Sequence, residues 1–238
     1  MNYFLSGYVL LEPNNSFKDK KSRYIIDYET DTILPGSHAI SWTEPSNEQI
    51  KEICDKYKLS NTDFKNLQGA TDHLYNEGRI FSIQILNVIV FKNRNDATEI
   101  FNKYFSKNQN NDVKLFGIYL PAEYYQKILT ENFSEMIKMV KQKIEMQNDE
   151  KVIGFDVVNC IKFGENLRFA FSEAIKCKIE ENDYGLLKSY SDCKKLIENT
   201  DFEYIHNTVV TLLDGKYTPS GDNIIDHWIP WLFTEVVI

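Results

Sequence analysis

The C-terminal residues Trp228–Ile238 (WIPWLFTEVVI) constrain the fold more than any other segment. Eight of these eleven residues are Trp, Ile, Leu, Phe or Val, so both faces of an extended chain are apolar here. The segment is much shorter than the roughly 20 residues that a membrane-spanning helix needs. Pro230 cannot donate to a ladder, which places it near the start of a strand or at a sheet edge. We expect a terminal strand that is covered on both faces; the alternative is a cradle for an aromatic ligand.

Strand and helix patterns follow one another irregularly along the rest of the chain. The strongest strand pattern is Arg79–Phe91, where apolar and polar residues alternate and the β-branched end indicates a central position in a sheet. The mixed order of elements predicts an α+β or α/β fold, with a mixed sheet and several amphipathic helices. Further strands are expected at Tyr3–Leu11, Arg23–Glu29, Val113–Leu120, Val152–Val158 (with Ile153, Phe155 and Val157 on one face) and Leu167–Ile179.

Helix patterns lie between the strands. Ser46 followed by Gln49 fits a capping box at the start of the first helix. Asp96 is the expected N-cap of a second helix, and Pro121 fits the first turn of a third. The apolar faces are expected to hold Ile50, Ile53, Cys54 and Tyr57; Ile100, Phe101, Tyr104 and Phe105; Phe133, Met136, Ile137, Val140 and Ile144; and Tyr190, Cys193, Leu196 and Ile197.

The length of 238 residues suits one large domain or two small ones. We expect a single compact unit over residues 1–238, with a seam near 147–151 that would separate an N-terminal from a C-terminal subdomain. Met1–Leu5 has no cationic segment before it, so no secretory signal is expected. The four cysteines form no CxxC pair, and a cytoplasmic protein with reduced thiols is therefore expected.

The chain is acidic: 35 Asp and Glu outweigh 27 Lys and Arg, which gives a net charge of −8. Nucleic-acid binding requires a cationic surface, so this balance argues against it, while a basic protein partner would be attracted. No phosphate-binding loop and no nucleophile elbow occurs. Membrane insertion is not expected either, because the apolar runs are short.

Candidate catalytic residues are scattered in the sequence. His38, His73, His206 and His227 show no metal-ligand spacing. Cys54 and Cys193 fall on apolar helix faces, where a thiol is inert and structural. No catalytic residue, cofactor or metal is therefore predicted. An enzyme whose site is assembled from distant residues stays open as an alternative, and its first suspects are Cys160, His206, Asp226 and His227.

The most acidic stretch is Glu198–Asp226, which contains six acidic residues and a single basic residue, Lys216. Acidic and aromatic side chains on turn-rich segments are suited to docking a basic protein, although a solvated acidic face that aids solubility is equally compatible with the pattern. The predicted partner-binding residues are Glu198, Asp201, Glu203, Tyr204, Tyr217 and Asp222.

Three C-terminal segments, Val152–Cys160, Glu181–Glu198 and Trp228–Val237, resemble the layout of small bacterial immunity proteins, which protect a cell from a neighbour's polymorphic or contact-dependent toxin. In that layout a GFD strand comes first, an N-x-YGL turn leads into a helix, and a Trp-containing strand closes the chain. The matching residues are Gly154-Phe155-Asp156, Asn182-Asp183-Tyr184-Gly185-Leu186, and Trp228 with Trp231. The strand and helix pattern of Leu115–Leu129 is also similar to units of such proteins.

The resemblance implies a role rather than a set of site residues: a cytoplasmic, non-enzymatic binder that neutralises one cognate toxin by steric occlusion. The acidic charge, which favours a basic effector domain as partner, points the same way. Besides the enzyme, a phage or mobile-element accessory protein that acts by self-association stays open, and so does a homo-oligomeric state.

Overall fold

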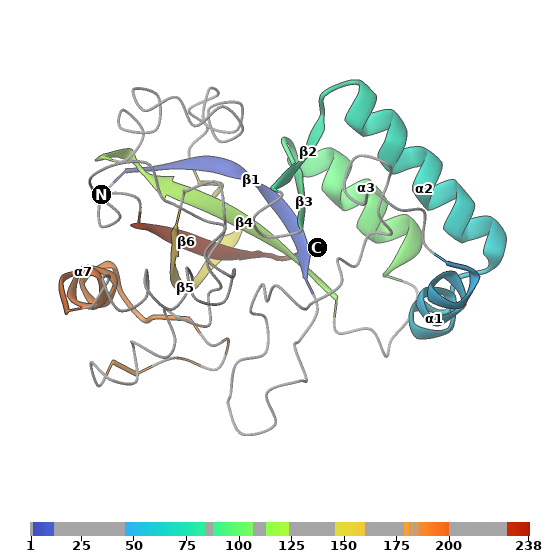
Figure 1. The fold of residues 1–238 in the computed structure, drawn as a ribbon. Helices are drawn as coiled ribbons and strands as arrows, with labels where there is room; N and C mark the ends of the chain where they lie inside the picture. The colour runs from blue at the N-terminus through green and yellow to red at the C-terminus, as the bar shows by residue number, and fades with distance from the viewer. Residues whose placement is uncertain are drawn as a thin grey trace, which may run out of the picture.

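The computed structural model describes residues 2–11, 46–83, 88–106, 113–123, 146–159, 179–180, 182, 184, 186–199 and 228–238. Within these residues, six strands form one sheet and four helices lie beside it (Figure 1). The α+β fold expected from the sequence is confirmed. All pairings between the described strands are antiparallel, so in this part of the chain the sheet that we expected to be mixed has one type of pairing.

The sheet has the strand order β2-β3-β1-β4-β6-β5. Its centre is formed by the first strand of the chain, the last strand and the strand that lies between them, so the two ends of the sequence are joined by hydrogen bonds across β4. The strands are β1 (Tyr3–Leu11), β2 (Ile80–Ile83), β3 (Val88–Phe91), β4 (Lys114–Pro121), β5 (Glu150–Asn159) and β6 (Trp228–Val236).

The helices form two groups. Figure 1 shows α1, α2 and α3 together beside β2 and β3, whereas α7 lies near β5 and β6. The capping box of Ser46 and Gln49 is confirmed at the start of α1, with both reciprocal hydrogen bonds present. The helices are α1 (Asn47–Tyr57), α2 (Asn61–Asn76), α3 (Arg94–Tyr104) and α7 (Tyr190–Asn199).

One hydrophobic cluster joins both helical groups to the sheet. It contains Tyr57 of α1, Ile100 of α3 and Leu196 of α7, together with Tyr119 and Leu232 from the strands. The opposite face of the sheet is also buried, so the sheet is covered on both sides. Its buried residues include Val9, Phe116, Ile118, Trp231 and Phe233.

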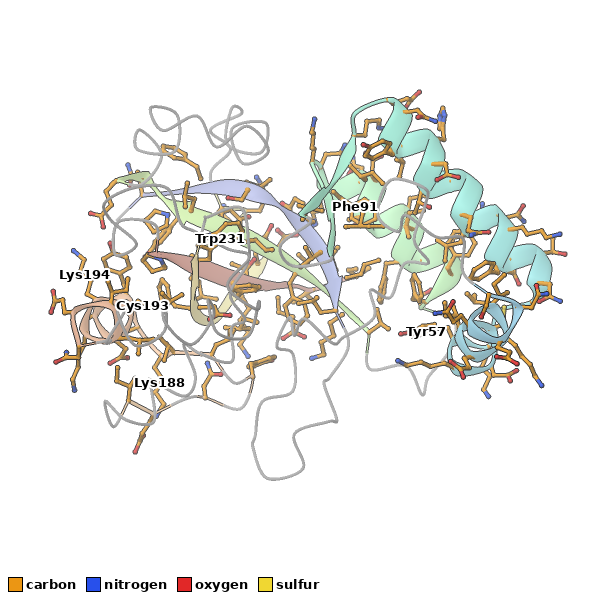
Figure 2. All side chains as sticks on the ribbon, in the orientation of Figure 1. Tyr57, Phe91, Lys188, Cys193, Lys194 and Trp231 are labelled. Carbon is orange, nitrogen blue, oxygen red and sulfur yellow. The ribbon has the colours of Figure 1, made fainter. Side chains whose placement is uncertain are left out.

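The terminal strand expected from the sequence is confirmed as β6. It lies between β4 and β5, and Pro230 is near its start, opposite Val157. Trp231 is only 2% exposed and lies within the sheet (Figure 2), so its indole ring belongs to the core.

The expectation of a single central strand over Arg79–Phe91 is wrong. The segment instead folds back on itself as β2 and β3, with Ile80 opposite Phe91, and β2 lies at an edge of the described sheet. Alternation of apolar and polar residues predicts extended chain, but it does not show whether the chain continues straight or reverses into a hairpin. The length of the segment was the available signal, since strands usually contain about 5–6 residues.

Two helix starts also differ from expectation. α2 was not expected, although Ser60 and Asp63 form a capping box at its start and Phe64 and Leu67 lie on its buried face. In α3 the N-cap is Asn93 rather than Asp96: the Asn93 side chain accepts from the Asp96 backbone N–H at 2.9 Å. Asp96 lies in the first turn instead, where a carboxylate is favoured by the helix dipole.

The remaining expectations have mixed outcomes. Pro121 is the last residue of β4, opposite Tyr3, and helical residues follow directly at Ala122 and Glu123, so Pro121 precedes the helix instead of lying in its first turn. The two cysteines that were expected on inward helix faces, Cys54 and Cys193, are buried. Burial, followed by nearby carboxylates, raises the pKa of both thiols, so neither is activated. The strand expected at 23–29 and the helix expected at 133–144 lie outside the described residues, as do the strand expected at 167–179 except its last residue and the helix expected at 121–129 beyond residue 123.

Candidate functional site

The predicted acidic surface is represented by Glu198, which is exposed in the last turn of α7. Asp201, Glu203, Tyr204, Tyr217 and Asp222 lie outside the described residues, as do the enzyme suspects Cys160, His206, Asp226 and His227. The last turn of α7 contains no basic residue. A carboxylate there faces the negative end of the helix dipole, so the position of Glu198 does not favour helix stability.

The structure brings together the described parts of three C-terminal segments, Val152–Cys160, Glu181–Glu198 and Trp228–Val237. Phe155 on β5 exchanges two backbone hydrogen bonds with Leu187, at 2.9 and 2.8 Å. On its other side, β5 pairs with β6, where Asp156 lies opposite Trp231. The GFD segment is therefore held between the turn that follows it in sequence and the Trp-containing strand. We name this arrangement the β5–β6 unit; it comprises β5, β6 and the turn residues Asn182, Tyr184, Leu186 and Leu187.

The turn is closed by the Asn182 side chain. Its Oδ1 accepts from the backbone N–H groups of Tyr184 and Leu186, at 2.9 and 3.2 Å, and its Nδ2 donates to the Ile153 carbonyl at 2.6 Å. Gly154 permits this close approach. It has φ +150°, and a Cβ atom there would lie 2.7 Å from the Leu186 Cβ and 2.9 Å from the Leu187 carbonyl oxygen. Glycine is thus required in the GFD segment by the turn that packs on it.

Tyr184 connects the turn to β6. Its hydroxyl donates to Glu235 Oε2 at 2.8 Å, and Lys114 on β4 contacts the other oxygen, Oε1, at 2.6 Å. Burial works to raise the pKa of the Glu235 carboxyl, but the hydrogen bonds from Lys114 and Tyr184 outweigh it, and the pKa lies below its ordinary value. The carboxylate is therefore ionised at neutral pH and ties the turn to two strands.

A second carboxylate lies deeper, in the middle of the sheet. Glu150 is 7% exposed at the start of β5. Its Oε1 accepts from the Tyr8 hydroxyl at 2.9 Å; its Oε2 accepts from the Tyr119 hydroxyl at 2.7 Å and from Thr234 Oγ1 at 2.5 Å. The three donors come from β1, β4 and β6. We call these four side chains the Glu150 network.

Gly117 provides the space for this network. A Cβ atom at position 117 would lie 2.6 Å from Thr234 Oγ1 and 2.8 Å from Glu150 Oε2, distances that force neighbouring atoms to move. Tyr8 and Thr234 are the cross-strand partners of Gly117 on either side. Three inter-strand spacings of about 4.8 Å separate β1 from β5, a distance of roughly 14 Å between the two backbones. Because Gly117 has no side chain, the side chains of Tyr8 and Glu150 can meet over β4 and β6.

The charge of the Glu150 network is held next to an exposed ion pair. Arg94, at the start of α3, contacts Asp149 at 2.8 Å, and Asp149 immediately precedes Glu150. Burial, followed by the charge of Glu150, raises the pKa of Tyr8; burial, followed by the hydrogen bond to Glu150, raises the pKa of Tyr119. Both phenols therefore stay protonated as donors. Because all four side chains are buried, we assign the network a structural role.

These pKa shifts predict sensitivity to alkali. A folded-state pKa above the unfolded value of 10.0 stabilises the protein fully below pH 10, and this contribution is lost as the pH rises further. We expect the free energy of unfolding, measured in urea, to fall steeply above about pH 10. The double variant Tyr8→Phe/Tyr119→Phe is expected to be less stable at pH 8 but to show a shallower decline. An equally steep decline in that variant would contradict the assignment.

Sequence reasoning did not find the Glu150 network. The available signals were polar groups beside apolar residues in the strands: Tyr8 precedes Val9–Leu11, Tyr119 lies between Ile118 and Leu120, and Thr234 follows Leu232 and Phe233. No group of three or more His, Cys, Asp and Glu side chains within the described ranges is placed to hold a metal ion. Likewise, the helices described here include none that is long and apolar enough to cross a membrane.

Comparison with known proteins gave no match to a family model, to a curated protein or to a solved structure.

Proposed function

We propose that this chain is an immunity-type protein of the bacterial cytoplasm that binds a cognate toxin domain and neutralises it by covering its active site. The observation that carries the proposal is the β5–β6 unit. Three short segments resemble those of immunity proteins, and they lie up to 74 residues apart, from Gly154 to Trp228. Chance matches have no reason to pack together, yet here the Asn182 turn packs so closely on Gly154 that a Cβ atom would clash, and the same strand pairs with β6 on its other side.

The charge of the chain supports a basic partner. The net charge of −8 is concentrated toward the C-terminal region, where Glu198–Asp226 holds six acids and one lysine. Long-range attraction of this kind speeds association more than it strengthens the final complex. Glu198 is exposed at the end of α7, where the helix dipole disfavours a carboxylate, and its charge is accessible to a partner.

The test is co-expression with the cognate toxin gene, which this proposal expects directly beside the gene for this chain. We expect the parent protein to protect cells, and its association rate with the purified toxin domain to fall as salt rises, since exposed charges are screened beyond about 8–10 Å. Reversal of Asp201, Glu203 and Asp222 to Lys is expected to cut the association rate by at least tenfold. Tyr204→Ala and Tyr217→Ala are expected mainly to speed dissociation.

The matched control is a triple reversal of the same charge on α1, a helix that does not contain Glu198. Glu48, Glu52 and Asp55 are exposed on α1, in the other helical group. Their reversal to Lys changes the net charge equally but is expected to slow association only modestly. Cell death despite folded parent protein would refute the immunity role, and equal losses from both triple variants would refute the predicted binding surface.

A further inference from the structure

Two sets of inward-facing residues on β5 are out of phase with each other. Glu150 faces Tyr8 and Tyr119 on the core side of the sheet, and Phe155 belongs to the main hydrophobic cluster on that same side. Side chains alternate along a regular strand, so residues five positions apart point to opposite faces. A regular β5 can therefore bury Glu150 or Phe155 against this core, but not both.

A β-bulge resolves the conflict. Val152 lies opposite Thr234, and Gly154 lies opposite Phe233, so Ile153 is an extra residue with no partner on β6. A bulge bends the strand and redirects backbone groups. The redirected group here is the Ile153 carbonyl, which accepts the 2.6 Å hydrogen bond from Asn182 Nδ2. The bulge is thus the point at which the Asn182 turn is attached to the sheet.

We propose that Glu150 is a positioning residue: by holding the first residues of β5 with Glu150 inward, it sets the bulge at Ile153 and so docks the Asn182 turn. Among residues 150–152, Glu150 alone has a buried side chain, because Lys151 and Val152 are exposed. Three hydroxyl donors from β1, β4 and β6 converge on the Glu150 carboxylate. This inference concerns the fold and does not rest on the proposed function.

The chain of contacts has a defined order. The Glu150 network fixes the register of residues 150–152, and the hydrophobic core fixes that of Phe155 and Val157. The difference of one residue between the two registers appears at Ile153. A single polar residue within a structure is best supported as a determinant of register, rather than of stability, in other systems. Here the register in turn controls a turn that lies 29 residues away in sequence, at Asn182.

Amide hydrogen exchange, followed by NMR on the full chain, tests this order. In Glu150→Ala, the amide protons of Phe155 and Leu187, which bond each other's carbonyls, are expected to exchange at least tenfold faster relative to those of α2. The control Leu67→Ala opens the core under α2, where Leu67 is fully buried, and is expected to change this ratio in the opposite direction. Glu150→Gln retains an acceptor and the side-chain length, and is expected to recover most of the protection.

Two results would overturn the inference. One is a folded Glu150→Ala protein in which Phe155 and Leu187 keep their parental exchange relative to α2. If Glu150→Ala does not fold, the milder Tyr119→Phe is compared with Tyr104→Phe, whose buried hydroxyl has no hydrogen-bond partner within the described residues. Tyr119→Phe is then expected to speed exchange at Leu187 selectively, and equal exchange in both variants is the second refuting result.

Discussion

Replacement of Trp231 by alanine is expected to lower the free energy of unfolding by about 3–5 kcal/mol, as large-to-small substitutions of aromatic core residues do. The side chain is 2% exposed and lies on β6, which pairs with strands on both sides. Its indole N–H has no hydrogen-bond partner within the described part of the chain. The loss therefore comes from apolar packing and the remaining cavity rather than from a broken hydrogen bond. Urea denaturation at neutral pH measures it.

Two variants separate the contributions at this position. Trp231→Phe removes the unpaired N–H and part of the ring, so we expect it to cost less than half as much as alanine. Tyr75→Ala removes an aromatic side chain that is 44% exposed, and it is expected to change stability by less than about 1 kcal/mol. A loss below about 1 kcal/mol for Trp231→Ala would show that the ring is not part of the core and would favour the aromatic cradle.

The elements that sequence analysis predicted correctly are those with a clear local apolar pattern. β1 was expected at Tyr3–Leu11 and is found there; Leu5–Leu11 are all buried, so a largely apolar run marks this strand. The short helix containing Cys193 and Leu196 was found from its amphipathic period, since both side chains are buried. Where a local signal fixed a boundary, as Ser46 and Gln49 do, the boundary was also correct.

The failures have a common physical cause. The hairpin of β2 and β3 reverses within an apolar segment, and periodicity does not report direction. In β5 the expected face of Ile153, Phe155 and Val157 is broken at Ile153, because the bulge depends on a carboxylate whose partners are 142, 31 and 84 residues away. Contacts over such separations are decided by the assembled sheet and not by the local pattern. The β5–β6 unit was accessible only as three separate motifs.

The Glu150 network provides the second large effect. Glu150→Leu is expected to lower the free energy of unfolding by about 2–4 kcal/mol, because it removes the acceptor of the buried hydroxyls of Tyr8 and Tyr119, at about 1–3 kcal/mol for each stranded group. Thr234 Oγ1 keeps only the Gly117 carbonyl, at 3.4 Å. Relief of the buried charge offsets part of this cost. Leucine accepts no hydrogen bond from the three hydroxyls, so the loss combines the cost of the stranded donors with the release of the β5 register that the Glu150 network sets.

A concerted replacement distinguishes this explanation from simple loss of packing. When Glu150→Leu is combined with Tyr8→Phe, Tyr119→Phe and Thr234→Val, no donor remains to be stranded, and stability is expected to return to within about 1 kcal/mol of the parent. Tyr104→Phe is the control, because it removes a buried hydroxyl that has no hydrogen-bond partner among the described residues. It is expected to leave the free energy of unfolding unchanged, both in the parent and in Glu150→Leu. If the quadruple variant is less stable than Glu150→Leu alone, the cost lies in the shape of the cavity beside Gly117, and the hydroxyls are not its source.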